Sequence, residues 1–233
     1  MAMGPDGYAR RRGELEEYFD RTASETWKRL TSDQPVSGIR ATVRAGRDAM
    51  RAHLLDAMGQ DLSGRRVLDA GCGTGALSVE AARRGATVLA VDVAGSLVDI
   101  AAERAGEAAR SIDFRVGDMR DPAFGEFDHV VAMDSLIHYR LADILDVLAA
   151  FAPRTRRSIL FTFAPRTPLL ATMHAVGKLF PRSDRSPRIE PASEARLSAL
   201  LAKDPRFAAF RVAGTTRVAR GFYISQALEL ARG

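Results

Sequence analysis

The succession of apolar segments predicts an α/β fold with a doubly wound, mostly parallel, seven-stranded sheet of the Rossmann-like kind. Between residues 66 and 164, apolar runs of strand length alternate with helical patterns, which is typical of a parallel sheet covered on both faces. Two later runs have a short connection and predict an antiparallel C-terminal hairpin. Two helical patterns before the first strand predict an N-terminal helical cover, and an insertion after the fifth strand, at 165–191, predicts a lid.

The individual elements follow from apolar spacing and from glycine and proline breaks. Residues 1–12 have few core-forming side chains and predict a frayed end. Helices are expected at 13–30, 37–58, 76–84, 97–109, 141–151 and 193–201, and within the lid at 169–180. Strands are expected at 66–69, 86–93, 112–116, 127–133 and 158–164, followed by hairpin strands near 210–218 and 221–225.

The stretch VLDAGCGTG, residues 67–75, carries the strongest functional signal. Its glycines allow left-handed dihedrals and let the backbone approach a ligand closely at the start of a helix. Asp92 ends the next strand, where a carboxylate can accept both hydroxyls of a ribose. Together these features predict a site for an adenosine-containing cofactor, lined by Gly71, Cys72, Gly73, Asp92 and Val93.

Asp69 helps to decide which cofactor is bound. The pattern Gly71-x-Gly73-x-x-Ala76 also fits a loose dinucleotide fingerprint, but a carboxylate at Asp69 repels a pyrophosphate and attracts an ammonium group. S-adenosylmethionine carries an ammonium group and no phosphate. None of the four tyrosines is followed by the lysine of a Tyr-x-x-x-Lys dehydrogenase motif. We therefore predict an S-adenosylmethionine site; the alternatives are a nicotinamide site and a tight turn without a ligand.

Two more acids follow predicted strands at the same edge of the sheet. Asp118 and Met119 are placed to bracket an adenine, with the carboxylate accepting from the exocyclic amine and the thioether packing on the ring. The alternative for Asp118 is a simple turn residue. Asp134 follows the fourth strand and is assigned to the cofactor site, although it could face either the methionine end of the cofactor or the substrate.

Composition limits the possible partners. The chain has 233 residues, a net charge of +5 and a pI near 9.9, which suggest one main core and an anionic partner. Its one cysteine, Cys72, excludes a disulfide framework and suits a reducing cytoplasm. No apolar run approaches the roughly 18 residues of a spanning helix, so we expect a cytoplasmic or peripheral protein.

The predicted lid is basic and rich in proline. It carries Arg166, Arg182 and Arg185, which we expect to bind an anionic substrate; a solvated surface loop is the alternative. Trp27, the only tryptophan, either packs in the core or lines a pocket for a large flat ligand.

Several longer stretches resemble one family of enzymes. They are EYFDRTASETWKRLTSD (17–33), RATVRAGRDAMR (40–51), VVAMDSLIHY (130–139), GKLFPRSDRSP (177–187) and RGFYIS (220–225). With the glycine motif and the edge acids, they resemble magnesium-protoporphyrin IX O-methyltransferases of bacteriochlorophyll biosynthesis, which are class I S-adenosylmethionine-dependent methyltransferases. From the order of the elements we predict an N-terminal tail and helical cover at 1–60 and a methyltransferase domain at 61–233 that includes the lid.

The resemblance also implies a reaction: transfer of a methyl group to one propionate of magnesium protoporphyrin IX, giving the monomethyl ester and S-adenosylhomocysteine. It places His138 and Tyr139 against the acceptor and brings magnesium only inside the porphyrin, with no metal site of the protein. A magnesium chelatase subunit and the surface of the photosynthetic membrane are candidate partners. The chain lacks the proline-aromatic clamp after Asp134 that holds a flipped base, so no nucleic acid is expected. The alternatives are a methyltransferase for another small carboxylate, phenol or amine, and a non-catalytic porphyrin carrier.

Overall fold

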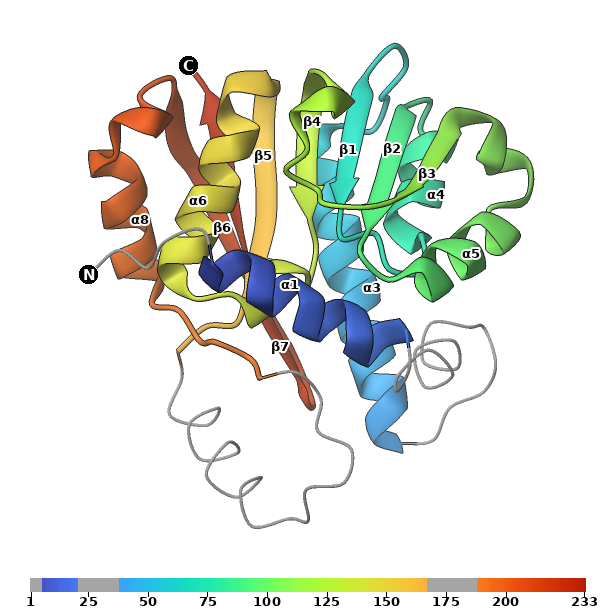
Figure 1. Ribbon diagram of the computed structural model, residues 1–233, viewed down its shortest axis with the longest axis horizontal. Helices are drawn as coiled ribbons and strands as arrows, with labels where there is room; N and C mark the ends of the chain where they lie inside the picture. The colour runs from blue at the N-terminus through green and yellow to red at the C-terminus, as the bar shows by residue number, and fades with distance from the viewer. Residues whose placement is uncertain (1–5, 21–37, 167–187) are drawn as a thin grey trace.

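A seven-stranded mixed sheet forms the centre of the molecule. The computed structural model describes residues 6–20, 38–166 and 188–233, and Figure 1 shows the sheet with helices on both faces. The strand order is β3-β2-β1-β4-β5-β7-β6, in which β7 runs antiparallel to β5 and β6 and the other pairs are parallel. The strands are β1 (Arg66–Ala70), β2 (Thr87–Asp92), β3 (Ile112–Val116), β4 (Phe127–Ala132), β5 (Thr155–Phe163), β6 (Phe210–Arg220) and β7 (Tyr223–Arg232). This order confirms the predicted fold class.

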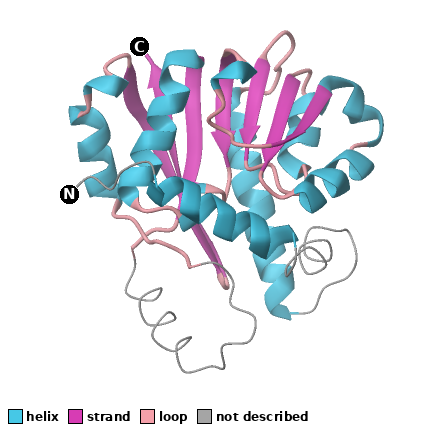
Figure 2. Ribbon diagram, viewed as in Figure 1, coloured by secondary structure: helices cyan, strands magenta, loops and turns pink. Residues whose placement is uncertain are grey.

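Helices cover the sheet in two layers (Figure 2). The α-helices are α1 (Asp6–Tyr18), α3 (Gly38–Met58), α4 (Ala76–Arg83), α5 (Gly95–Arg104), α6 (Leu141–Phe151) and α8 (Glu194–Lys203). Short 3-10 helices are η2 (Gly106–Ser111), η3 (Pro122–Phe124), η4 (Leu136–His138), η5 (Ala152–Arg154) and η6 (Pro205–Phe207). Buried residues of α1, α6 and α8 share one core cluster, whereas those of α3 and α4 share another. The first layer lies in front of the sheet in Figure 1 and α3 lies behind it.

The described N-terminal residues correct one expectation. Residues 6–12 are not frayed, because α1 begins at Asp6 and its Tyr8 is only 4% exposed. The remaining calls on 1–5 and 21–37, including Trp27, lie outside the described residues, as does most of the lid. The predicted boundary after residue 60 stays a prediction.

The bounds of α5 and of β7 also differ from expectation. The helix expected at 97–109 ends at Arg104, because Gly106 has a left-handed φ of 53° and a 3-10 helix follows. The last strand extends to Arg232 instead of ending at 225. Its alanine- and leucine-rich end has weak β propensity, but pairing with β5 and β6 on both sides fixes it as a strand.

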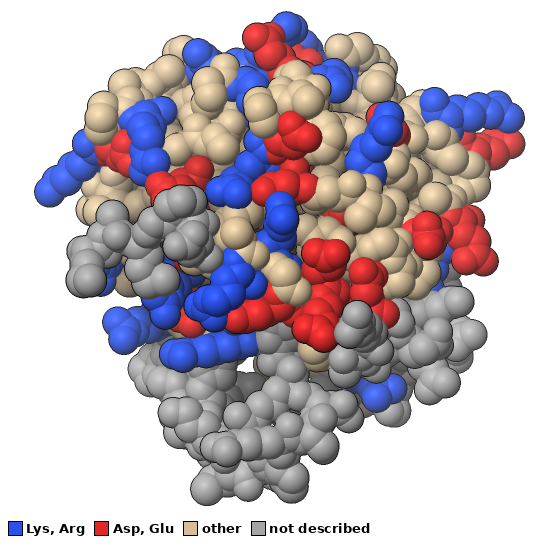
Figure 3. Space-filling model, viewed as in Figure 1, with Lys and Arg blue, Asp and Glu red and all other residues tan. Residues whose placement is uncertain are grey.

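The carboxyl ends of the parallel strands form the edge that carries the site. Asp69 belongs to β1, Asp92 ends β2, and Asp134 follows β4. The helix α1 crosses this edge in Figure 1. In Figure 3, Lys and Arg gather around the N-terminal half of α1, and Asp and Glu gather around its C-terminal half. This division follows the sequence RRRGELEE of residues 10–17.

Candidate functional site

A cavity of about 300 Å³ lies at this edge. The described residues that line it come from α1, α3, the glycine loop, and the segments after β2, β3 and β4. They are Leu15, Phe19, Arg44, Arg47, Asp48, Arg51, Asp69, Gly71, Cys72, Gly73, Thr74, Ala76, Leu77, Val91, Asp92, Val93, Leu97, Gly117, Met119, Met133, Asp134, Ser135, His138 and Tyr139. The cavity is therefore the place where most of the predicted site residues meet.

The glycine loop is fixed by backbone hydrogen bonds to β2. The amides of Gly71 and Cys72 both donate to the carbonyl of Val91, at 2.8 and 3.0 Å. Gly71 has a φ of 84°, and a Cβ at this position would lie 2.3 Å from the Cβ of Ser135. Glycine is thus required here both by conformation and by the close approach of the segment after β4.

Asp92 links the glycine loop to the end of β2. Its Oδ2 accepts from the amide of Gly73 at 2.8 Å, and its Oδ1 accepts from the amide of Ala94 at 3.0 Å. Burial raises the pKa of Asp92 above its ordinary value. Each carboxylate oxygen can accept more than one hydrogen bond, so Asp92 can hold a ribose diol while it keeps both backbone contacts.

Asp69 is almost completely buried, with 1% of its surface exposed. Burial raises its pKa to about 7, although a hydrogen bond of 2.6 Å from the hydroxyl of Ser78 lowers it. Burial also raises the pKa of the neighbouring Cys72 thiol. A thiol that resists ionisation is a poor nucleophile, which supports a lining role for Cys72.

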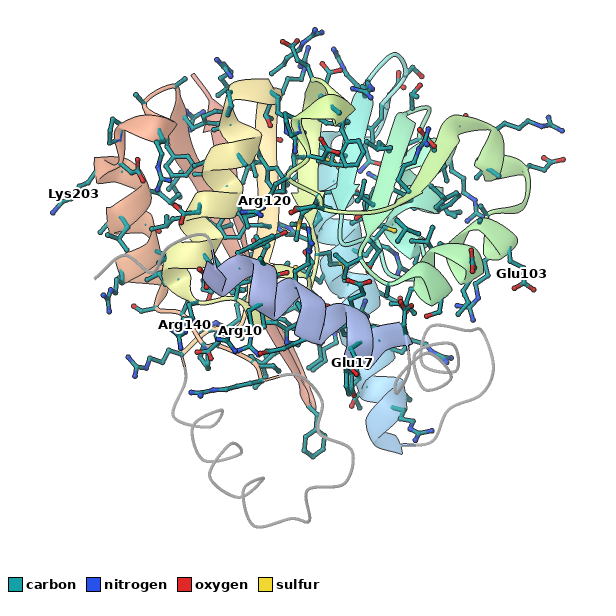
Figure 4. The ribbon with its side chains drawn as sticks, in the orientation of Figure 1. Arg10, Glu17, Glu103, Arg120, Arg140 and Lys203 are labelled. Carbon is teal, nitrogen blue, oxygen red and sulfur yellow. The ribbon has the colours of Figure 1, made fainter. Side chains whose placement is uncertain are left out.

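Asp118 does not line the cavity. Its carboxylate accepts from the hydroxyl of Tyr8 at 3.0 Å, from Arg12 at 3.0 Å and from Arg120 at 3.1 Å. Figure 4 shows Arg120 beside α1, and its guanidinium carbon lies 3.4 Å from the centre of the Tyr8 ring. Burial raises the pKa of Asp118, but the hydrogen bonds from Arg120 outweigh burial and leave this pKa below its ordinary value.

These contacts bring α1 and Arg120 to the Asp118 carboxylate, and its hydrogen bond with adenine stays a prediction. Met119, the other half of the predicted bracket, does line the cavity. Its carbonyl accepts from the buried Arg154 at 2.7 Å, which fixes the loop after β3.

Asp134 is the centre of a polar cluster between four elements. It is the one described non-glycine residue with a positive φ, at 55°. Its carboxylate accepts from Arg47 of α3 at 2.8 Å, from the hydroxyl of Tyr223 at 3.1 Å and from the hydroxyl of Ser225 at 3.2 Å. Its amide donates to the hydroxyl of Thr162 at 2.7 Å. Sequence reasoning found Asp134 but not these partners.

His138 and Tyr139 form the wall on the side of α1. The His138 ring lies 6.2 Å from the Phe19 ring in an edge-on arrangement, and its Nδ1 lies 3.3 Å from the carbonyl oxygen of Arg188. Tyr139 stacks on Tyr8 with the ring centres 5.0 Å apart. Burial raises the pKa of the Tyr139 hydroxyl, which favours the neutral phenol.

Of the four predicted substrate residues, Arg166 alone lies within the described part of the chain. Trp27, Arg182 and Arg185 lie outside the described residues. Arg166 is exposed and is not among the described lining residues, and its amide donates to the carbonyl of Ala192 at 3.0 Å. The arginines that do line the cavity come from α3, and their spacing at 44, 47 and 51 is the helical signal that sequence reasoning missed.

The strand order, the glycine loop and Asp92 at the tip of β2 define a Rossmann-like, class I S-adenosylmethionine-dependent methyltransferase fold. Two family models match the chain: a methyltransferase domain at residues 67–157 and the magnesium-protoporphyrin IX methyltransferase C-terminus at residues 132–232.

The chain is similar over nearly its full length to two proteins and to a solved structure. It is 52% identical to the magnesium-protoporphyrin O-methyltransferase of Rhodobacter capsulatus, over 97% of this chain and 98% of that protein. It is 30% identical to the Synechocystis protein of the same name, over 94% of this chain and 95% of that protein. A crystal structure of the Synechocystis magnesium protoporphyrin IX methyltransferase with bound SAH matches with a TM-score of 0.80 and 29% identity, covering 95% of this chain and 99% of that one. This chain belongs to the magnesium-protoporphyrin O-methyltransferase family.

Proposed function

We propose that this protein transfers a methyl group from S-adenosylmethionine to one propionate carboxylate of magnesium protoporphyrin IX. The products are the monomethyl ester and S-adenosylhomocysteine, in the pathway to bacteriochlorophyll. The observation that carries the proposal is a single cavity with two different walls. One wall consists of the glycine loop and Asp92, and the other of Phe19, His138 and Tyr139.

The first wall fits an adenosine-containing methyl donor. Gly73 has a φ of 53° and no atom within 4 Å of where its Cβ would lie, so the loop is open to a ligand there. Asp92 lines the cavity beside Val93, and Met119 offers an apolar contact for a flat ring. These residues would hold the ribose and the base, and Asp118, next to Met119, stays a proposed contact for the base.

The reaction requires little acid–base chemistry from the protein. A propionic acid has an ordinary pKa of about 4, so the acceptor is already a carboxylate near neutral pH. When bound, the sulfonium group of the donor supplies the electrophilic methyl group. The task of the protein is therefore to hold a carboxylate oxygen in line with that methyl group, about 3 Å away.

His138 is placed to orient the acceptor. A carbonyl oxygen only accepts, so the contact with Arg188 puts a hydrogen on Nδ1. Nε2 then donates to a carboxylate when the ring is charged, or accepts a residual acid proton when it is neutral. Tyr139 is 2% exposed and stacked on Tyr8, so we assign it to shaping this wall.

The remaining proposals concern location and partners. No helix in the described part of the chain is long and apolar enough to cross a membrane. We propose a cytoplasmic enzyme that meets its hydrophobic substrate at the photosynthetic membrane or on a magnesium chelatase subunit. The basic lid at 165–191, with Arg182 and Arg185, is proposed to bind the propionates.

Incubation of the purified protein with labelled donor tests the function. Magnesium protoporphyrin IX should gain one labelled methyl ester, and metal-free protoporphyrin IX serves as the matched acceptor for specificity. Binding of the porphyrin without any transfer of label would point to a carrier and would refute the proposal. Label found on other small acids but not on the porphyrin would refute the choice of substrate.

A further inference from the structure

The turn between β6 and β7 presents an aromatic side chain to solvent. Gly221 and Phe222 form a two-residue loop, since Arg220 and Tyr223 are the last cross-strand pair. Phe222 is 53% exposed, and among the described residues Val116 alone is a comparably exposed large apolar side chain. In Figure 1 the lower end of β7, which carries this turn, extends beyond the parallel strands. A single exposed apolar side chain is ordinary, so its significance depends on the residues around it.

The turn is fixed against the start of α3. Gly221 has a left-handed φ of 58°, and a Cβ there would lie 2.5 Å from the hydroxyl oxygen of Thr42. One turn further along the helix, a Cβ at Gly46 would lie 2.5 Å from the ring of Tyr223. The two glycines therefore let the hairpin and the helix approach closely. Because its support is already ordered, Phe222 can meet a partner at a small cost in conformational entropy.

The chain segments that meet at this turn are basic. Residues 38–47 and residues 205–228, which include the hairpin turn, contain arginines and no acid. Arg40 of α3 and Arg220 of β6 are exposed, and no ion pair joins either of them to another described residue. We call Phe222, Arg40 and Arg220 the hairpin patch. The patch combines one apolar side chain with two positive charges, which complements a surface that is anionic outside and apolar beneath.

The hairpin patch lies next to the cavity on the side of α3. Arg44, one helical turn from Arg40, lines the cavity, and so does Asp134, which accepts from the hydroxyl of Tyr223 at 3.1 Å. Tyr223 directly follows Phe222 in the chain. A surface that contacts the patch therefore lies close to the cavity in which we place the methyl transfer. Such a surface would be a suitable source of a hydrophobic acceptor.

We propose that the hairpin patch docks the protein on an anionic lipid bilayer, with Phe222 at the boundary of the acyl chains and the two arginines at the headgroup phosphates. The proposal rests on the proposed function, because it assigns the surface through which that enzyme meets its hydrophobic acceptor. Stable protein–protein interfaces bury roughly 800 Å² on each partner, far more than one phenyl group offers. Weak, reversible membrane binding needs only a small apolar insertion together with a few cations, so the patch fits a bilayer better than a protein.

Sedimentation of the purified protein with lipid vesicles tests the docking. Vesicles of phosphatidylglycerol and phosphatidylcholine in equal parts should bind the wild type, and vesicles of phosphatidylcholine alone should bind it more weakly. Phe222→Ser, Arg40→Gln and Arg220→Gln should each weaken binding to the anionic vesicles by roughly threefold to tenfold, the factor expected for one half-exposed phenyl group or one arginine at an anionic surface. Raising the ionic strength from about 0.15 M to about 1 M should also weaken it, because the screening length falls from about 8 Å to about 3 Å.

Two variants are matched controls. Val116→Ser removes the other exposed apolar side chain, whose neighbour Arg115 is paired with Asp113 at 2.8 Å. Arg211→Gln removes an exposed arginine of the same strand, roughly 30 Å along β6 from Arg220. Both controls should bind the vesicles as the wild type does. Affinity for S-adenosylhomocysteine should be unaltered in every variant, which verifies that each one is folded.

Three results would overturn the proposal. The first is a wild type that does not bind the anionic vesicles, or that binds them no better than Phe222→Ser does. The second is a patch variant that binds the vesicles normally but no longer binds a magnesium chelatase subunit, because the patch would then be a protein interface. The third is slower methylation of magnesium protoporphyrin IX by Phe222→Ser without vesicles, because Phe222 would then contact the acceptor. A wild type without this activity would refute the proposed function, whereas the vesicle experiment would still decide the docking.

Discussion

Asp69 gives a prediction about stability that follows directly from its burial. Its carboxyl group is 1% exposed, and its pKa rises from an ordinary 3.8 to about 7, chiefly because burial disfavours the charged form. Asp69→Asn removes the ionisation and keeps an oxygen that can accept the hydroxyl of Ser78, which donates to Asp69 at 2.6 Å. The substitution therefore isolates the free-energy effect of one buried charge.

The sign follows from proton binding. Between pH 4 and 7 the folded protein keeps a proton on Asp69 that the unfolded chain releases, so the contribution of Asp69 to stability is largest below pH 4 and falls as pH rises to about 7. The interval from 3.8 to about 7, at roughly 1.36 kcal/mol per pH unit, amounts to about 4 kcal/mol. Relative to wild type, Asp69→Asn should become more stable by up to this amount as pH rises from 4 to 8.

Urea unfolding of the ligand-free protein at several pH values measures this difference. Subtracting the unfolding free energy of wild type from that of Asp69→Asn cancels the contributions of the other acids. Using only the change of this difference with pH also cancels the constant effect of the amide. Ser78→Ala should extend the falling limb to higher pH, since the Ser78 hydrogen bond lowers the pKa of Asp69. A difference in unfolding free energy that stays constant from pH 4 to 8 would refute the reasoning.

Three further predictions concern the donor site and the acceptor wall. Asp92→Asn should weaken binding of S-adenosylhomocysteine at least tenfold, because charge-assisted hydrogen bonds contribute roughly 1.5 to 3 kcal/mol. The control Asp113→Asn, at an exposed position, should leave this binding unchanged. If calorimetry gives the same affinity for wild type and Asp92→Asn, Asp92 is not part of the site. His138→Ala should keep the donor affinity and lower kcat, by less than the roughly 100-fold expected for loss of a general base. If the variant has the kcat of wild type, the role of His138 is structural. Arg154→Met should lower the unfolding free energy by roughly 1.5 to 3 kcal/mol, because the carbonyl of Met119 loses its donor, and unaltered urea unfolding would contradict this role.

The core of the sheet was predictable because its signals are local. The strand at Ile112–Val116 and the helix at Leu141–Phe151 have the predicted bounds, since their apolar runs end at glycine, proline or charged residues. The glycine loop and Asp92 meet as expected, because the ends of adjacent parallel strands lie at one edge. The hairpin strand at Tyr223–Arg232 was underestimated because its pairing partners, not its composition, determine its length.

The polar partners of the site were not predictable in the same way. The contact between Tyr8 and Asp118 joins residues 110 positions apart, and that between Arg47 and Asp134 joins residues 87 positions apart. The sequence indicates that each of these residues lies on a helix or at a strand end. It predicts an N-terminal helical cover, but it does not indicate which acid each helix of that cover reaches.

The sequence by itself therefore determined the order of strands and helices, the glycine loop and the acid at the tip of β2, because hydrophobic period and glycine conformation act over a few residues. The tertiary structure alone decided that α1 brings Arg12 to Asp118 and that α3 brings Arg47 to Asp134. Those choices depend on how two helical layers pack on opposite faces of one sheet. Such packing is a property of the whole chain, and no short pattern encodes it.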